Sequence, residues 1–305
     1  MPPMQQPAVV VVNWNDAART ARCLRSLAAG DPPPRVYVVD NASAEDPAEL
    51  LRAELASVRL IRLSVNRGYA AGCNAGAAVA LEEGAYQLLF LNNDTEVEPT
   101  TVMALQNASS RHPDAILGPT IVFAADPGRV WSAGGVVRRP WMVNWHLGQG
   151  EPINGHRESH RIDWTTGCAM FVTAGTYRRL GPFDESLFIY LEDLDWCLRA
   201  SRLGIETRLV ADAILRHEVS ATTSRLPTPA VLYYGCRNTY RIAFRHATTL
   251  RRLAMLPPLA ATVAKLALRH AFWPSRRGDA HYRARTSAIL DFIRGRTGPW
   301  QAAVQ

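Results

Sequence analysis

Short apolar runs recur along the first hundred residues, and each run ends at a cluster of polar residues. Such runs predict strands that are buried on both faces, as in a parallel sheet. The predicted strands cover residues 8–12, 35–39, 58–63 and 88–91. The predicted helices between them run through residues 24 and 27, around 50–55, and over an alanine-rich stretch at 75–83. Strands that alternate with helices predict an α/β fold, a mostly parallel sheet with helices on both faces.

Polar side chains follow each of these four strands. The clusters are Asn13 and Asn15; Asp40, Asn41 and Ser43; Asn66 and Gly68; and Asn92, Asn93 and Asp94. One such cluster would indicate only a turn, since Asn, Asp and Gly are common turn residues. Four in succession lie along one edge of a parallel sheet, where open α/β sheets bind ligands. The pattern therefore favours a nucleotide site at this edge.

The cluster at residues 92–94 offers amide and carboxylate oxygens at the end of a buried run. Such oxygens suit a hard divalent cation, Mg²⁺ or Mn²⁺, which is commonly bound together with substrate phosphates. Glycines at 68, 72 and 76 permit a close approach of the backbone. They form neither a GxGxxG fingerprint nor a Walker loop, so the sequence predicts neither a dinucleotide site nor an NTPase P-loop.

The second half of the chain is less regular. Strands are predicted at 119–123, 163–172 and 207–210, and residues 131–160 suggest a binding loop or surface aromatics over a core edge. Acids at 192, 193 and 195 open a helix that ends before Gly204. Acids in a first helical turn are favoured by the helix dipole, but one of them could equally serve as a general base. His217 follows the last strand and is either structural or a ligand.

Charge divides the chain into two parts. From residue 230 to the end there are 13 Arg and Lys against two acids, a net charge of +11, whereas the whole chain carries +7. We therefore expect a domain over residues 1–229 and a helical basic extension over 230–305. Such an extension favours an anionic surface, and acidic phospholipid is preferred to nucleic acid because no nucleic-acid motif accompanies the charge.

The apolar stretch at 253–268 is interrupted by Pro257, Pro258 and Lys265 and is too short to span a bilayer. An interfacial helix flanked by Arg residues at 251, 252, 269, 276 and 277 is expected, and a helical cap packed on the body is the alternative. Five scattered cysteines predict free thiols in a reducing compartment. The first residues lack a signal-peptide pattern, so the expected location is cytoplasmic, peripheral on the inner face of the plasma membrane.

Five motifs occur in an order that resembles the inverting family 2 glycosyltransferases of GT-A fold, especially the rhamnosyltransferase-like members. The motifs are Val-Val-Asn-Trp-Asn at 11–15, Val-Asp-Asn-Ala-Ser at 39–43, Asn-Arg-Gly-Tyr-Ala-Ala-Gly-Cys-Asn at 66–74, Leu-Asn-Asn-Asp-Thr at 91–95, and Gly-Pro-Phe-Asp-Glu at 181–185 with Glu-Asp-Leu-Asp-Trp-Cys-Leu-Arg at 192–199, followed by a His. The resemblance covers residues 8–220.

The resemblance implies roles for residues along the predicted edge. Asp40 matches the acid that contacts the nucleobase, and Asn13 and Asn15 line the same pocket. The segment beside the ribose and base is matched by Asn66, Gly68 and Asn74. Asn92, Asn93 and Asp94 stand at the family's Asp-x-Asp metal motif, with Asn92 replacing the first Asp. Asp94 and His217 are then the expected metal ligands.

Asp193 corresponds to the family's catalytic base, and Glu192 beside it would raise the pKa of that base if the two are buried together. Trp164, Trp196 and Arg237 are expected to contact the acceptor. The donor expected from the resemblance is dTDP-rhamnose, with UDP and GDP sugars as alternatives, and the acceptor is a lipid-linked or polysaccharide hydroxyl. A nucleotidyltransferase would need a Gly-rich phosphate loop that residues 9–16 lack. A non-catalytic membrane or scaffold protein of the same fold is the remaining alternative.

Overall fold

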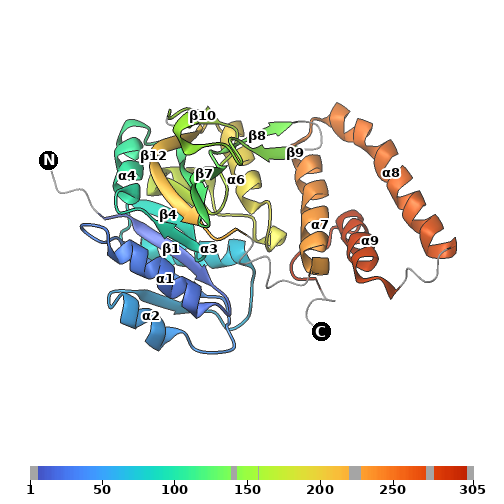
Figure 1. Cartoon of the computed structure of the whole chain (residues 1–305). Coiled ribbons are helices and arrows are strands. Elements are labelled where there is room, and N and C mark those ends of the chain that lie inside the picture. Colours follow the sequence, from blue (N-terminus) through green and yellow to red (C-terminus); the bar gives the residue numbers. More distant parts are fainter. Residues whose placement is uncertain (1–5, 139–142, 157, 220–227, 273–277, 301–305) are drawn as a thin grey trace. The chain divides into compact units, whose positions relative to one another are not determined.

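The computed structural model describes residues 6–138, 143–156, 158–219, 228–272 and 278–300 (Figure 1). The chain divides into two compact units. The first contains residues 1–136, 145–185 and 192–219, and the second contains 137–144, 186–191 and 220–305. Each unit is described by itself below.

The first unit is built on a mixed sheet that has ten strands among the described residues. Its strands are β1 (Ala8–Asn13), β2 (Arg35–Asp40), β3 (Arg59–Arg62), β4 (Gln87–Asn92), β5 (Thr95–Val97), β6 (Ile116–Phe123), β7 (Asp126–Ser132), β10 (Arg161–Ile162), β11 (Ala169–Thr173) and β12 (Thr207–His217). The order is β10-β12-β6-β11-β4-β1-β2-β3, with β5 beside β12 and β7 beside β6. The strands β1, β2, β3 and β4 are parallel, as predicted, whereas β11 runs antiparallel to both β4 and β6.

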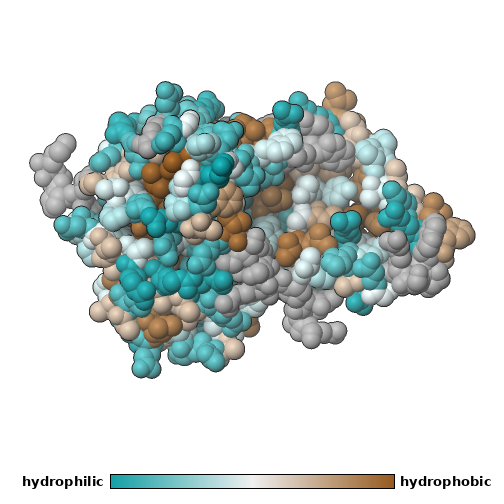
Figure 2. All heavy atoms as spheres, viewed as in Figure 1, coloured by the Kyte–Doolittle hydropathy of each residue, from teal (hydrophilic) through white to brown (hydrophobic). Residues whose placement is uncertain are grey.

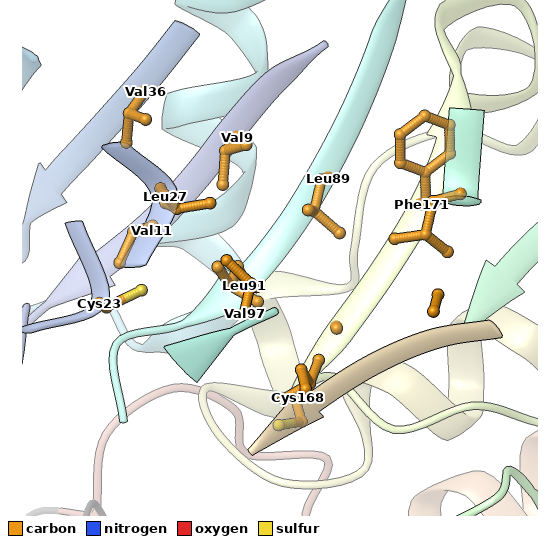
Figure 3. Close-up of a cluster of buried hydrophobic side chains, with 14 of the residues drawn as sticks. Val9, Val11, Cys23, Leu27, Val36, Leu89, Leu91, Val97, Cys168 and Phe171 are labelled. Carbon is orange, nitrogen blue, oxygen red and sulfur yellow. The ribbon is translucent and has the colours of Figure 1, made fainter. Parts of the chain in front are cut away.

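Helices cover both faces of this sheet. They are α1 (Ala17–Ala28), α2 (Ala48–Glu54), α3 (Tyr69–Glu82), α4 (Thr101–Arg111), α5 (Ala174–Leu180) and α6 (Glu192–Arg202), with short 3₁₀ turns η1 (Ile153–Gly155) and η2 (Glu185–Leu187). Successive side chains of a strand point to opposite faces. Val9 and Val11 therefore join Leu27 of α1 in one core cluster, drawn in Figure 3. Val10 lies on the other face, where a Cβ added to Gly76 of α3 would be 2.4 Å from its side chain.

Three predicted boundaries differ from the structure. The helix predicted to start at residue 75 begins at Tyr69, because its first turns also pack on the sheet and are buried. The strand predicted at 163–172 is a strand only over Ala169–Thr173, since residues 163–168 mostly turn before entering the sheet. The last strand extends beyond residue 210 to His217 and pairs with both β6 and β5.

The predicted binding loop at 131–160 contains regular structure. Its first residues complete β7, and β8 (Gly135–Arg138) and β9 (Val143–His146) form a separate two-stranded sheet. This segment is therefore a set of short strands over much of its described length.

The second unit is helical. It contains α7 (Thr228–His246), α8 (Thr249–Phe272) and α9 (Ala280–Ile293). An aromatic cluster between α7 and α9 forms its core, in which the rings of Tyr233 and Trp300 stack at 4.9 Å. Within the described parts of the chain, no helix has both the length and the apolar character needed to cross a bilayer.

All five cysteines are free thiols, as predicted. Cys236 is half-buried and the other four are buried. Burial raises the pKa of the Cys23 and Cys197 thiols to about 12. A buried thiol in apolar surroundings is chemically inert, which fits a packing role for these side chains.

Candidate active site

The polar clusters predicted at the strand ends converge where the strand order reverses. From β1 the chain adds β2 and β3 on one side, and β4 then pairs with the other side of β1. The register pairs Val12 with Asn92, so the ends of β1 and β4 meet. Open α/β sheets bind ligands outside the carboxyl ends of their strands at such a reversal.

A hydrogen-bonded network surrounds Asp40, whose side chain is fully buried. Asn13 Nδ2 donates to Asp40 Oδ1 at 2.8 Å and to Ser43 Oγ at 3.1 Å. The Ser43 N–H donates to Asp40 Oδ2 at 3.2 Å, and Arg62 Nε lies 3.3 Å from the same oxygen. A buried carboxylate is tolerated when it is paired and hydrogen-bonded, and this one has both kinds of partner. Asp40 is therefore a fixed, charged acceptor at the end of β2.

Asn15 and Asn66 hold the loops beside this network. Asn15 is exposed, has a φ of 51°, and its Oδ1 accepts from the Ala44 N–H at 2.8 Å. Asn66 Oδ1 accepts from the Gly68 N–H at 2.9 Å, and Gly68 O accepts from Asn41 Nδ2 at 3.0 Å. Gly68 has a φ of 87°, which favours glycine, directly before α3. The predicted residues Asn13, Asn15, Asp40, Asn66 and Gly68 thus lie on adjoining loops of one edge.

Asn74 is used differently. Its Nδ2 donates to Phe183 O at 3.0 Å and to Glu185 Oε1 at 3.1 Å, and its Oδ1 accepts from the Phe183 N–H at 3.0 Å. The amide holds the 183–185 segment with both of its ends. These contacts give Asn74 a structural role, and the ribose contact expected from the resemblance stays a prediction.

The end of β4 brings two predicted metal ligands together. Asp94 and His217 are both buried, and His217 Nε2 lies 3.3 Å from Asp94 Oδ1. Antiparallel pairing of β12 with β5 creates this contact, because it places His217 opposite Thr95. The His217 ring packs edge-on against Trp131 at 4.5 Å between ring centroids.

Neighbouring Asn93 turns away from this pair. Its Nδ2 donates to Thr20 Oγ1 at 3.0 Å, and Thr20 donates in turn to Asn13 Oδ1 at 2.7 Å. Asn93 therefore links the end of β4 to the Asp40 network. Asn92 is the last residue of β4 and is half-buried.

The residues present fit a cation that is shared with a ligand. Among the described residues, no group of three or more His, Cys, Asp and Glu side chains could hold a metal ion. The Asp94 carboxylate and the His217 imidazole nevertheless converge, and the buried Nδ1 of His217 has no hydrogen-bond partner. Mg²⁺ is commonly held by one or two protein ligands together with substrate phosphates, which is the number of ligands available here.

Two neighbouring acids open α6. Asp193 is half-buried, and its two oxygens accept from the backbone N–H groups of Gly167 and Leu194, each at 2.7 Å. Glu192 is buried, and its Oε2 has no hydrogen-bond partner. Burial first, and then the charge of Asp193, raise the pKa of Glu192 to about 8. Burial also raises the pKa of Asp193, although the backbone donors oppose this shift.

The raised pKa of Glu192 favours a state at neutral pH in which Glu192 keeps a proton, and the two backbone donors favour the carboxylate form of Asp193. The third acid, Asp195, is fully buried and pairs with Arg199 Nε at 2.9 Å. Its position and partner suit helix stability. Of the three acids that open the helix, Asp193 is therefore the best placed to accept a proton.

The turn at 166–168 lies between Asp94, at the end of β4, and Asp193, at the start of α6. Asn92 donates its N–H to Cys168 O at 2.9 Å, and the antiparallel register places Ala169 opposite Leu91. Burial raises the pKa of the Cys168 thiol well above its usual range, and the charges of both Asp94 and Asp193 add to this rise. The carboxylates of Asp94 and Asp193 thus flank one turn.

Sequence reasoning missed three residues of this site: Thr20, Arg62 and Tyr69. The parallel register of β2 with β3 pairs Asp40 with Arg62, so the predicted strand at 58–63 held the signal for that contact. Tyr69 donates to Gly167 O at 2.8 Å and so ties the start of α3 to the turn beside Asp193. No sequence signal separated Thr20 from other polar residues of α1.

The three side chains that were expected to contact the acceptor are all buried. Trp196 is fully buried, packs edge-on against Phe90, and donates to Gly181 O at 2.9 Å. Trp164 is 3% exposed and lies against Gly135. Arg237, in the second unit, is fully buried and donates to the carbonyls of Leu187, Gly298 and Ser186 at 3.0, 2.8 and 3.3 Å.

Comparison with known proteins agrees with this geometry. Residues 8–180 match the family described as Glycosyl transferase family 2. The N-acetylglucosaminyl-diphospho-decaprenol L-rhamnosyltransferase of Mycobacterium tuberculosis is 26% identical over 267 residues, which cover 78% of this chain and 84% of that protein. The dTDP-rhamnosyl transferase RfbF of Shigella flexneri is 23% identical over 271 residues, covering 86% and 87%.

Among solved structures, the mannosyltransferase PcManGT from Pyrobaculum calidifontis, in complex with GDP-Man and Mn²⁺, superimposes with a TM-score of 0.57 at 14% identity. The superposition covers 95% of this chain and 88% of that one, so the two share a fold. The predicted resemblance and the predicted GT-A fold are confirmed. The chain belongs to glycosyl transferase family 2 and is a glycosyltransferase.

Proposed function

We propose that this enzyme transfers L-rhamnose from dTDP-rhamnose to a hydroxyl of a lipid-linked or polysaccharide acceptor in cell-surface glycan synthesis, with inversion at the anomeric carbon. The observation that carries the proposal is the convergence of a buried Asp40 network, the Asp94–His217 pair and Asp193 at one edge of the sheet. The names of two relatives support rhamnose, and one of them also names a polyprenol-linked acceptor. A UDP or GDP sugar is the alternative donor, and PcManGT holds GDP-Man.

The nucleotide end of the donor fits the Asp40 network. Asp40 supplies a fixed negative acceptor, which suits the N–H group of a pyrimidine or guanine base. Asn13 fixes this carboxylate from one side and Arg62 from the other. Because Asp40 has no exposed surface, part of this network has to shift to admit the base.

The diphosphate end fits the Asp94–His217 pair. A divalent cation bound there, Mg²⁺ or Mn²⁺, would neutralise the negative charge of the departing nucleotide diphosphate. Asp94 and His217 would be its protein ligands. With Asn92 in place of an acid, the donor phosphates complete the set of ligands, so we expect the metal and the donor to bind cooperatively.

Asp193 would then act on the acceptor. The backbone donors of Gly167 and Leu194 fix its carboxylate, and Glu192 remains protonated beside it. Asp193 accepts the proton of the acceptor hydroxyl as the oxygen attacks the anomeric carbon from the face opposite the diphosphate. The bond from carbon to the diphosphate oxygen breaks as the new glycosidic bond forms, and the configuration inverts.

The test is turnover with a panel of donors. Purified protein would be assayed for release of nucleoside diphosphate from dTDP-rhamnose, UDP sugars and GDP sugars, with lipid extract as acceptor and with Mg²⁺, Mn²⁺ or EDTA. Metal-dependent release from dTDP-rhamnose above all other donors is expected. Preference for a UDP or GDP sugar would overturn the choice of rhamnose, and the absence of donor binding would favour a non-catalytic role.

We also propose that the enzyme works at the inner face of the plasma membrane as a peripheral protein. The basic second unit and the polyprenol acceptor named for one relative support this location. Protein in the membrane fraction of a cell lysate that is released by high salt is the expected result.

A further inference from the structure

The helix α8 has one face that packs within the second unit. Met255 and Leu259 are buried, and Thr262, Val263 and Leu266 are half-buried. The Tyr282 hydroxyl of α9 donates to Leu266 O at 2.9 Å. These positions recur at intervals of three or four residues, so they lie on one side of the helix.

The opposite side of α8 is both apolar and exposed. Leu250, Leu253, Leu268 and Phe272 are 78%, 57%, 56% and 71% exposed. Exposed small or apolar residues fill the positions between them at the same spacing: Pro257, Ala261 and Ala264. We call these seven residues the α8 stripe. At 1.5 Å per residue the stripe is about 33 Å long. Figure 2 shows hydrophobic residues on the surface over α8, at the right of the view.

Basic side chains border the α8 stripe. Arg251, Lys265 and Arg269 each follow a stripe residue directly and lie along one border of the stripe; all three are exposed. Arg252 lies on the other side of the helix, where its Nη2 donates to Arg245 O at 3.1 Å. Arg276 and Arg277, which the sequence placed in the same group, lie outside the described residues. No Asp or Glu occurs between Glu218 and Asp279. An apolar face with a basic border is typical of a helix that lies in a membrane interface.

We propose that the α8 stripe is a docking surface for an anionic phospholipid bilayer. Its apolar side chains enter the boundary between headgroups and acyl chains, while Arg251, Lys265 and Arg269 contact lipid phosphates. This proposal deepens the proposed function, since it names the surface at which a lipid-linked acceptor would be met.

The positive charge of α8 favours lipid, and not a second copy of the chain, as the partner of the α8 stripe. Two copies joined through α8 would bring two sets of basic side chains together without any acid on the helix to pair with them. An anionic leaflet supplies the opposite charge along the whole helix, and each basic residue near it strengthens binding by about fivefold. The helix would lie along the surface, because its other side packs within the second unit and only the α8 stripe faces outward.

The experiment is co-sedimentation of the full-length protein with vesicles. Vesicles of phosphatidylcholine with phosphatidylglycerol are compared with vesicles of phosphatidylcholine alone, at low and high salt. The wild type should bind the anionic vesicles and lose binding as salt rises. The double variant Leu253→Ser/Leu268→Ser and the double variant Arg251→Gln/Arg269→Gln should each bind at least about tenfold more weakly.

Matched controls come from the first unit. Leu203→Ser changes an exposed leucine and Arg178→Gln an exposed arginine, neither of which lies on α8. Both should bind like the wild type. Asp193→Asn should also bind vesicles normally, and the α8 variants should keep donor binding in solution, so failure of docking and failure of the proposed reaction are separate results.

Three outcomes would overturn the proposal. One is equal binding of the α8 variants and the wild type. Another is equal binding to anionic and neutral vesicles. In the last, the wild type does not bind vesicles but associates with itself or with an acidic protein, and the serine variants abolish that association.

Discussion

The two units depart from the ordinary distribution of side chains in opposite ways. The first buries ionisable and amide groups at the edge of its sheet, among them Asp40, Asp94 and Glu192. The second leaves large apolar side chains, such as Leu250 and Phe272, in contact with solvent. Buried acids and extended exposed apolar faces are both uncommon in soluble proteins. Each departure supports the ligand that we propose for its unit, a nucleotide sugar in the first and a lipid surface in the second.

The buried acids of the first unit also differ from one another. Asp40 has hydrogen-bond donors and a guanidinium around it, whereas Glu192 has an oxygen without any partner. A fully hydrogen-bonded acid is fixed in position, whereas burial without a partner raises the pKa of Glu192. Asp40 thus suits binding, and the Glu192–Asp193 pair suits the transfer of a proton.

The largest effect is expected from Asp193→Asn, which removes the proton acceptor and leaves the shape of the side chain nearly unchanged. A fall in kcat on the order of 10²–10⁴-fold is expected at saturating donor. The control is Asp212→Asn, the same change at an exposed position of β12. Equal kcat in Asp193→Asn and the wild type would remove Asp193 from the mechanism.

A smaller effect should follow from Asp40→Asn, which takes the charge out of the buried network. Hydrogen bonds to a charged group contribute about 1.5–3 kcal/mol, so KM for the donor should rise roughly tenfold to hundredfold with little change in kcat. Asp46→Asn is the matched control, because Asp46 also contacts Arg62, at 2.9 Å, but is exposed. A loss confined to kcat would mean that Asp40 serves chemistry instead of binding.

The pH dependence of stability should change in Glu192→Gln. The pKa of Glu192 is raised in the folded protein from 4.5 to about 8, so the folded state binds more protons than the unfolded state between these values. Its contribution is fully present below pH 4.5 and is lost as pH rises through 8. The stability of the variant relative to the wild type should therefore improve between pH 5 and pH 8, by on the order of 1 kcal/mol per pH unit.

Urea unfolding of both proteins at several pH values would measure this difference. If the free energy of unfolding depended on pH in the same way in the wild type and in Glu192→Gln, the carboxyl of Glu192 would ionise as easily in the folded protein as in the unfolded chain.

The smallest effect is expected from a substitution on the exposed face of α8, in the second unit. Leu253→Ser, on the α8 stripe, should change the free energy of unfolding by no more than about 0.5 kcal/mol in solution. Leu259→Ser, on the buried face of the same helix, should destabilise by about 2–5 kcal/mol. Thermal unfolding without lipid compares the two. Equal destabilisation would show that the stripe is packed against protein in solution.

Much of the first unit could be predicted because its strands are buried on both faces, which gives the continuous runs that end at Asn13, Asp40 and Asn92. The antiparallel course of β11 could not be predicted, since the direction of a strand leaves no mark on its own residues. Likewise, proximity of Asp94 to His217 came only from the resemblance, because it depends on the pairing of β5 with β12.

Burial is the property that the residue types alone did not reveal. Trp196 and Arg237 suggested acceptor contacts because aromatic and basic side chains often bind ligands. Trp196 instead fills the space beside Phe90, and Arg237 satisfies backbone carbonyls in a fully buried position. An arginine is rarely buried unless it is paired, and its partners here are carbonyl groups that the sequence does not reveal.

The burial of the native cysteines has a consequence for labelling chemistry. Only the thiolate form reacts with maleimides and iodoacetamides, and the pKa of every native thiol is raised. A cysteine introduced as Leu268→Cys would be exposed, with an ordinary pKa of about 8.5, and would react first at neutral pH. A single fluorophore could then be attached to the wild-type background, where its emission would distinguish water from hydrocarbon.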